Sequence, residues 1–156
     1  MSDTDEKARK AVSRFNDLFY GKTPYEPDPT YPTELHIGGR VYDIMHFLNV
    51  GEVFIMGRDL SKRGLELRAE GNHTHVDFII KNQADIPESF RKRVRFIFPN
   101  RINCWGARDY EYLEVVFWGT QSKKWCQMID WVNYHGWNND DGSRMVRLRT
   151  EKEKGQ

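Results

Sequence analysis

The chain has 156 residues, and 24 Lys and Arg side chains stand against 23 Asp and Glu, so its formal net charge is +1. This length suits one domain, because two domains of half the size would each fold around a very thin core. The balanced charge argues against an acidic or basic tail protein. No apolar run approaches the roughly 20 residues that a membrane-spanning helix needs, so no membrane association is expected.

The sequence also bears on the cellular compartment. Residues 1–10 are charged throughout and lack the apolar stretch of a signal peptide. The two cysteines, Cys104 and Cys126, are too few to staple a secreted scaffold and lie outside any CxxC spacing. We therefore expect a cytoplasmic protein in a reducing compartment.

The first 33 residues contain two different segments. Residues 1–20 are predicted to form an amphipathic helix that Gly21 ends. Its apolar residues recur at the spacing of one helix face: Ala8, Ala11, Val12, Phe15, Leu18 and Phe19. Residues 21–33 hold four of the six prolines and are predicted to form an extended arm.

Residues 34–150 are predicted to form a sheet with helices, followed by a charged tail at residues 151–156. Gly38-Gly39 separates two apolar stretches and suits the turn of a hairpin. Further strands are predicted at residues 53–56, 65–69, 74–80, 94–98, 112–118 and 145–148. The apolar spacing predicts a short helix at 41–48 and a late helix at 122–136.

These elements predict a single-domain α+β fold. The strands follow one another too closely for a helix after each of them, which argues against a doubly wound parallel sheet. We expect a curved, mostly antiparallel sheet of about six strands, with the N-terminal, short and late helices packed on it.

Polar and apolar residues alternate between Asn72 and Ile80. On a strand, His73, His75 and Asp77 would project from the same face. Two imidazoles at this spacing can bind one zinc or similar divalent ion, with the carboxylate completing or orienting the set, as a metal-dependent hydrolase would require. The same alternation is typical of any half-exposed antiparallel strand. We favour the solvated strand and keep the metal site as an alternative.

Residues 91–108 contain six basic residues and no acidic one. On a strand, Arg91, Arg93 and Arg95 would share one face and could bind phosphates. Aromatic rings nearby, such as Trp105, would stack on bases. An Arg-rich face also protects the edge of a sheet from pairing with another chain. The residues of this candidate site for nucleic acid, a nucleotide or another phosphorylated ligand are Arg91, Arg93, Arg95, Arg101 and Trp105.

No motif typical of catalysis is present, since the chain lacks a GxSxG elbow, a P-loop and a GxGxxG loop. We therefore favour a non-catalytic binding module that acts through a protein partner, as an inhibitor, an immunity protein or an adaptor does. Trp137, Asp140 and Asp141 are candidates for the partner surface, because tryptophan is frequent at binding hot spots. The alternative is that Trp137 belongs to the core. Phosphate-ligand binding is the second hypothesis and metal-dependent hydrolysis the third.

Overall fold

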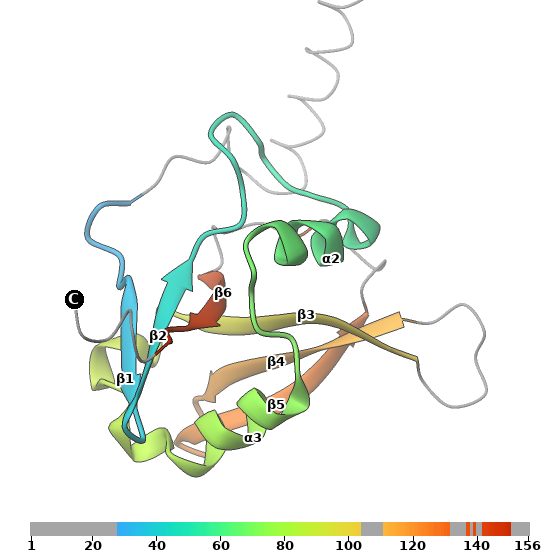
Figure 1. The fold of residues 1–156 in the computed structure, drawn as a ribbon. Coiled ribbons are helices and arrows are strands. Elements are labelled where there is room, and N and C mark those ends of the chain that lie inside the picture. The colour runs from blue at the N-terminus through green and yellow to red at the C-terminus, as the bar shows by residue number, and fades with distance from the viewer. Residues whose placement is uncertain (1–27, 104–110, 132–136, 138, 140–141, 151–156) are drawn as a thin grey trace, which may run out of the picture.

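The computed structural model describes residues 28–103, 111–131, 137, 139 and 142–150 (Figure 1). The helix predicted at residues 1–20, most of the predicted arm and the predicted tail lie outside this part of the chain. So do Trp105, Asp140 and Asp141 of the candidate sites.

Six strands form one sheet in the order β1-β2-β6-β3-β4-β5. Their bounds are β1 Glu34–Ile37, β2 Arg40–Met45, β3 Arg95–Asn103, β4 Glu111–Gly119, β5 Lys124–Trp131 and β6 Ser143–Leu148. Neighbouring strands run antiparallel, except that β3 and β6 run parallel. The predicted α+β class and the mostly antiparallel sheet of six strands are thus confirmed for the described residues.

Two α-helices and two short 3₁₀ helices connect β2 to β3. They are α2 Gly57–Glu66, α3 His73–Lys81, η1 Gln83–Asp85 and η2 Glu88–Phe90. Helix α3 begins at a capping residue, since the side chain of Asn72 accepts a hydrogen bond from Thr74 N at 3.0 Å. Its residues Val76 and Ile79 are buried at helical spacing. The strand predicted at 74–80 is therefore wrong, and the strand predicted at 65–69 is replaced by the end of α2 and the loop after it.

The hairpin of β1 and β2 forms at the predicted place. Gly38 and Gly39 have φ of 55° and 79°, a pair of left-handed conformations that suits a two-residue turn between antiparallel strands. The helix predicted at 41–48 is wrong, because β2 occupies most of this segment. Strand β2 pairs with β1 on one side and with β6 on the other, and this double pairing outweighs the apolar spacing.

The late helix predicted at 122–136 is also wrong over its described residues, which belong to β5. Gly119 begins a tight turn in which Lys123 N donates a hydrogen bond to Gly119 O at 2.8 Å. The chain then pairs with β4 along its whole length, from Lys124 opposite Gly119 to Trp131 opposite Tyr112. This pairing makes β5 one edge of the sheet of described strands.

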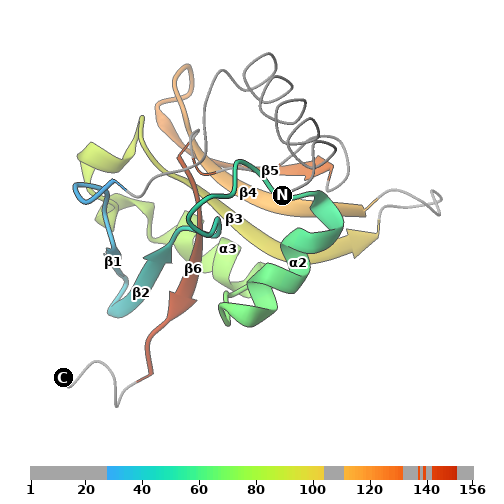
Figure 2. The ribbon, with the colours of Figure 1, turned by 90° about the horizontal axis from the view of Figure 1, so that it is seen from above.

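Helices α2 and α3 lie on opposite faces of the sheet (Figures 1 and 2), and each covers a separate hydrophobic core. Alternate residues of β3 supply them. Phe96 and Phe98 pack with Val76 and Ile79 of α3 in the first core, whereas Ile97 packs with Leu60 of α2 in the second. Both faces of β3 are therefore buried, and the strand fixes the position of the turn that precedes it.

Helix α2 is held to the loop after β2 by an ion pair. The Arg63 guanidinium donates to both carboxylate oxygens of Glu52, at 2.7 and 3.0 Å, and also to the carbonyl oxygen of Phe47. These hydrogen bonds from Arg63 hold the pKa of Glu52 below its usual value and raise the pKa of Arg63. The folded state therefore favours the ionised form of Glu52.

Replacing Glu52 with glutamine is expected to lower the free energy of unfolding at neutral pH by about 1 kcal/mol, because the pair is only partly buried. The stabilisation exists above the unfolded-state pKa of about 4.5 and is lost as pH falls through the lowered folded-state pKa. Urea unfolding at about pH 7 and about pH 3 measures both effects. A difference between wild type and Glu52→Gln that stays equal at the two pH values would contradict this account.

Candidate anion-binding site

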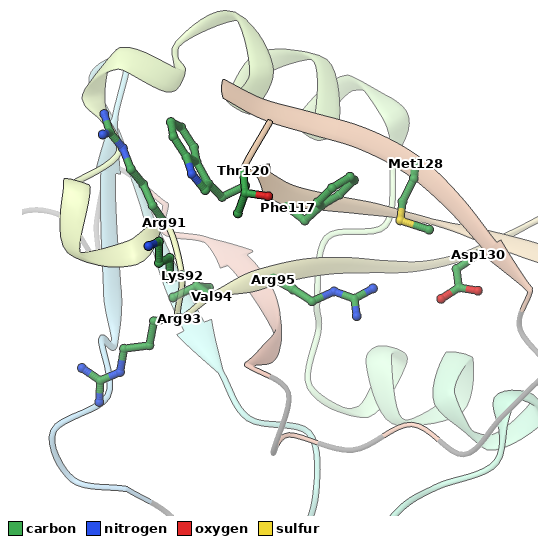
Figure 3. Close-up of a pocket in the computed structure, with 10 residues that line it drawn as sticks. Arg91, Lys92, Arg93, Val94, Arg95, Phe117, Thr120, Met128 and Asp130 are labelled. Atoms are coloured by element: carbon green, nitrogen blue, oxygen red, sulfur yellow. The ribbon is translucent and has the colours of Figure 1, made fainter. Parts of the chain in front are cut away.

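A pocket of about 600 Å³ lies where the turn before β3 meets β4 and β5 (Figure 3). This volume is in the range of about 300–1,000 Å³ that small-molecule sites occupy. The lining combines basic residues, apolar residues and two further polar ones: Arg91, Lys92, Arg93 and Arg95; Val94, Phe117, Trp118 and Met128; Thr120 and Asp130. Four cations against one carboxylate give these residues a formal charge of +3.

The basic turn, residues Arg91 to Arg93, is placed by its apolar neighbours. Phe90 and Val94 are buried at 6% and 2% exposure, and the carbonyl oxygen of Phe90 accepts hydrogen bonds from Arg93 N and Val94 N. The chain between them is forced outward, so the three basic side chains are exposed. The prediction that Arg91, Arg93 and Arg95 share one strand face is wrong, because β3 begins only at Arg95.

Arg91 is oriented by an aromatic ring. Its guanidinium carbon lies 4.4 Å from the centroid of the Trp118 ring, which is a cation–π contact. A guanidinium stacked by its face keeps the N–H groups in its plane available to a ligand. The ion pair of Arg91 with Glu88 is long, at 3.6 Å, and Glu88 is 85% exposed, so it neutralises Arg91 weakly.

Arg93 belongs to the rim of the pocket rather than to its floor. Its Nη2 donates to Asp28 Oδ2 at 3.1 Å and to Thr30 Oγ1 at 2.8 Å, and its guanidinium lies 4.9 Å from the Tyr31 ring centroid. Hydrogen bonds from Thr30, followed by the charge of Arg93, hold the pKa of Asp28 below its usual range. Figure 3 shows the Arg93 side chain turned away from Phe117.

The floor of the pocket lies on the face of the sheet that α2 covers, beyond the end of the helix. Met128 lies opposite Val115 and Asp130 opposite Leu113, and both of these β4 residues are in the second core. Phe117 is two residues beyond Val115 and so faces the same way. Arg95, two residues before Ile97, also points to this face, and Figure 3 shows its guanidinium directed towards Asp130.

Sequence reasoning found only part of this site. Arg91, Arg93 and Arg95 line the pocket as a group. Arg101 belongs to β3, but its side chain is not among the described ones. Trp105 lies outside the described residues altogether. The floor residues Phe117, Met128 and Asp130 were missed. Only the pairing of β5 with β4 brings them together, and the helix predicted for that segment concealed it.

The candidate metal residues do not converge. On α3, His73 and His75 are two positions apart and so point in different directions. His73 Nδ1 lies 2.8 Å from Glu114 Oε2, whereas His75 Nδ1 lies 2.8 Å from the Tyr42 hydroxyl, and Asp77 pairs with Lys81 at 3.0 Å. Among the described residues no group of three or more His, Cys, Asp or Glu is arranged to hold a metal ion.

Trp137, the aromatic residue of the predicted partner surface, is buried and cannot contact a partner. Trp137 is only 2% exposed and packs in the second core with Phe47, Leu60 and Met145. Its backbone bonds to Ile55 in both directions, at 2.8 and 2.9 Å, and this isolated bridge is all that forms of the strand predicted at 53–56. The interpretation of Trp137 as a core residue is therefore the correct one, and a protein partner stays a prediction without a described surface.

The fold and the pocket together define an α+β protein with a basic, aromatic-lined cavity at the start of a central strand. Comparison with models of known families, with curated proteins and with solved structures finds no match. Within the described ranges, neither α-helix has the length and apolar character needed to cross a membrane.

Proposed function

We propose that the protein is a small binding module that holds an anionic, phosphate-bearing ligand in the pocket at the start of β3. The observation that carries the proposal is the basic turn at one end of a concave site with a partly apolar floor. Phosphate oxygens accept hydrogen bonds and attract cations, and both are offered by the exposed residues Arg91 and Lys92.

Two features make this turn a suitable anion site. The ring of Trp118 packs against the first core, on the other face of the sheet from Phe117, and the stacking of Arg91 on this ring orders the guanidinium at the edge of the pocket before a ligand arrives, which lowers the entropic cost of binding. Lys92 makes no ion pair with any described residue, so a ligand would not have to displace an existing partner.

Replacing Lys92 with glutamate is expected to weaken the binding of inorganic pyrophosphate by about tenfold or more, because an attractive charge becomes a repulsive one. Lys62→Glu is the matched control, since Lys62 is exposed on α2 and does not line the pocket. Isothermal titration calorimetry at low ionic strength measures both variants. Equal losses in Lys92→Glu and Lys62→Glu, or no binding to the wild type, would refute the site.

Salt separates this proposal from the protein-partner hypothesis. Contacts to phosphate weaken steeply as the salt concentration rises, whereas an interface built on aromatic packing changes little. The same calorimetric titration, repeated at rising salt concentrations, therefore reports whether the bound ligand depends on the cations of the pocket.

A further inference from the structure

Charges in the pocket are segregated. The basic turn, with three consecutive cationic residues, stands at one end of the lining and Asp130 at the other, and the Arg95 guanidinium points from the middle of the lining towards Asp130 (Figure 3). In the same view Phe117 lies above the Arg95 side chain and Met128 lies above Asp130, so the apolar residues run beside the path from the turn to Asp130. A ligand that fills this pocket therefore has an anionic end, a body that tolerates apolar contact, and a second polar end of different character.

This segregation argues for a compact ligand rather than a polymer. A nucleic acid strand carries a phosphate on every nucleotide, and proteins that bind it provide cations along a groove. Here the excess positive charge is confined to the basic turn, and the far end offers a cation beside a carboxylate. A second phosphate would meet the carboxylate of Asp130, which repels it.

The middle of the pocket suits a flat ring. Phe117 is half-buried, and Met128 is 38% exposed in the neighbouring strand, so a ligand that covered them would remove apolar surface from water. An aromatic ring packs well against a phenyl ring, and the methionine thioether adapts to the edge of a ring. A sugar or an aliphatic chain would gain less from this floor.

The far end suits the edge of a nucleobase. The guanidinium of Arg95 offers only donors and the carboxylate of Asp130 offers only acceptors. Nucleobases carry donors and acceptors side by side on their edges, and Arg and Asp are among the residues that read them. Figure 3 shows the Arg95 guanidinium directed towards the Asp130 carboxylate, so a base edge at this end of the pocket would meet donors and an acceptor at once.

We propose that the ligand is a mononucleotide, with its phosphate at the basic turn, its base on Phe117 and Met128, and the edge of the base at Arg95 and Asp130. This inference rests on the proposed function of the pocket and adds the orientation and chemical class of the ligand. It also predicts that the base contributes to the affinity, so a phosphate compound without a base binds less tightly than the nucleotide.

Calorimetry with the four ribonucleoside monophosphates and with ribose 5-phosphate tests the inference. At least one nucleotide is expected to bind about tenfold or more tightly than ribose 5-phosphate, which lacks the base. Asp130→Asn is expected to change the ranking among the four nucleotides by about threefold or more, with the affinity for ribose 5-phosphate nearly unchanged. Asp59→Asn, which makes the same chemical change on the exposed side of α2, is the matched control.

Phe117→Leu provides a second test, should Asp130→Asn fail to fold. It keeps an apolar side chain but removes the ring, so nucleotide affinity is expected to fall by about threefold or more while ribose 5-phosphate is unaffected. Equal affinities of nucleotides and ribose 5-phosphate would overturn the nucleotide assignment and leave the phosphate site standing. No binding of any of these anions would overturn both. A short oligonucleotide that binds far more tightly than any mononucleotide would overturn the assignment in favour of a strand.

Discussion

Gly142→Ala is expected to destabilise the protein by about 3 kcal/mol or more, because the new methyl group would meet backbone rather than a flexible side chain. A Cβ at this position would lie 2.0 Å from the carbonyl oxygen of Arg93, and the φ of Gly142 is +85°. The carbonyl oxygen of Gly142 accepts hydrogen bonds from Arg95 N and from the Tyr31 hydroxyl, both at 2.9 Å. Relief of the clash would therefore break the junction between β6 and β3.

Gly39→Ala is the matched control for this prediction. Gly39 has a similar φ of +79°, but a Cβ there would meet no atom within 4 Å. Only the strain of a left-handed backbone remains, which costs about 1–2 kcal/mol. Urea unfolding of the two variants measures the difference, and equal losses would show that backbone strain, not the contact with Arg93, explains the effect.

The same substitution also bears on the pocket. Gly142 lies against the basic turn at Arg93, and the single proton of the Tyr31 hydroxyl is shared between Arg93 O, at 2.6 Å, and Gly142 O, at 2.9 Å. A Gly142→Ala protein that still folds at low temperature should therefore bind pyrophosphate less tightly than wild type. The junction that positions β3 is the same one that positions the cations.

Local sequence signals predict the structure correctly where neighbouring residues alone determine it. The hairpin at Gly38-Gly39 is an example, since glycine adopts positive φ without strain and apolar residues flank it on both sides. Strands at the places of β3, β4 and β6 are also predicted, because short apolar stretches with β-branched and aromatic residues, bounded by turn residues, favour strands over helices. These elements were enough to predict the α+β class.

The spacing of apolar residues gives the wrong element where it fits both the 3.6-residue period of a helix and the two-residue period of a strand. Trp125, Met128 and Ile129 fit a helix face, yet in β5 Trp125 is buried whereas Met128 and Ile129 are 38% and 49% exposed. An edge strand packs less completely than a central one, so its alternation is weak. The opposite error occurred at His73 to Lys81, where an alternating pattern concealed a helix capped by Asn72.

The candidate site was therefore only half visible from the sequence. Its basic turn is continuous in the chain, so the run of positive charges in the sequence predicts it. Its floor comes from two strands that meet through the register of β4 and β5, with Phe117 opposite Cys126 and Val115 opposite Met128. Such register depends on long-range pairing, which one sequence does not reveal once a strand has been taken for a helix.

A single buried amide holds together the loop after β2 and the start of β6. Asn139 is 2% exposed, and its Oδ1 accepts hydrogen bonds from Phe47 N at 3.1 Å and Leu48 N at 2.9 Å. Its Nδ2 donates to Ser143 O at 2.7 Å. Both donor residues are almost fully buried, so no water is at hand to replace the amide oxygen.

Asn139→Ala is expected to lower the free energy of unfolding by about 3 kcal/mol, since two buried N–H groups lose their partner and the Ser143 carbonyl keeps only its hydrogen bond from Arg144. Urea unfolding measures the loss. Asn49→Ala is the matched control: Asn49 is exposed, its side chain makes no hydrogen bond within the described part of the chain, and its loss should stay within about 0.5 kcal/mol. A cost for Asn139→Ala as small as that of Asn49→Ala would mean that the loop after β2 relaxes to reach water, and that β2 and β6 are joined by their strand pairing alone.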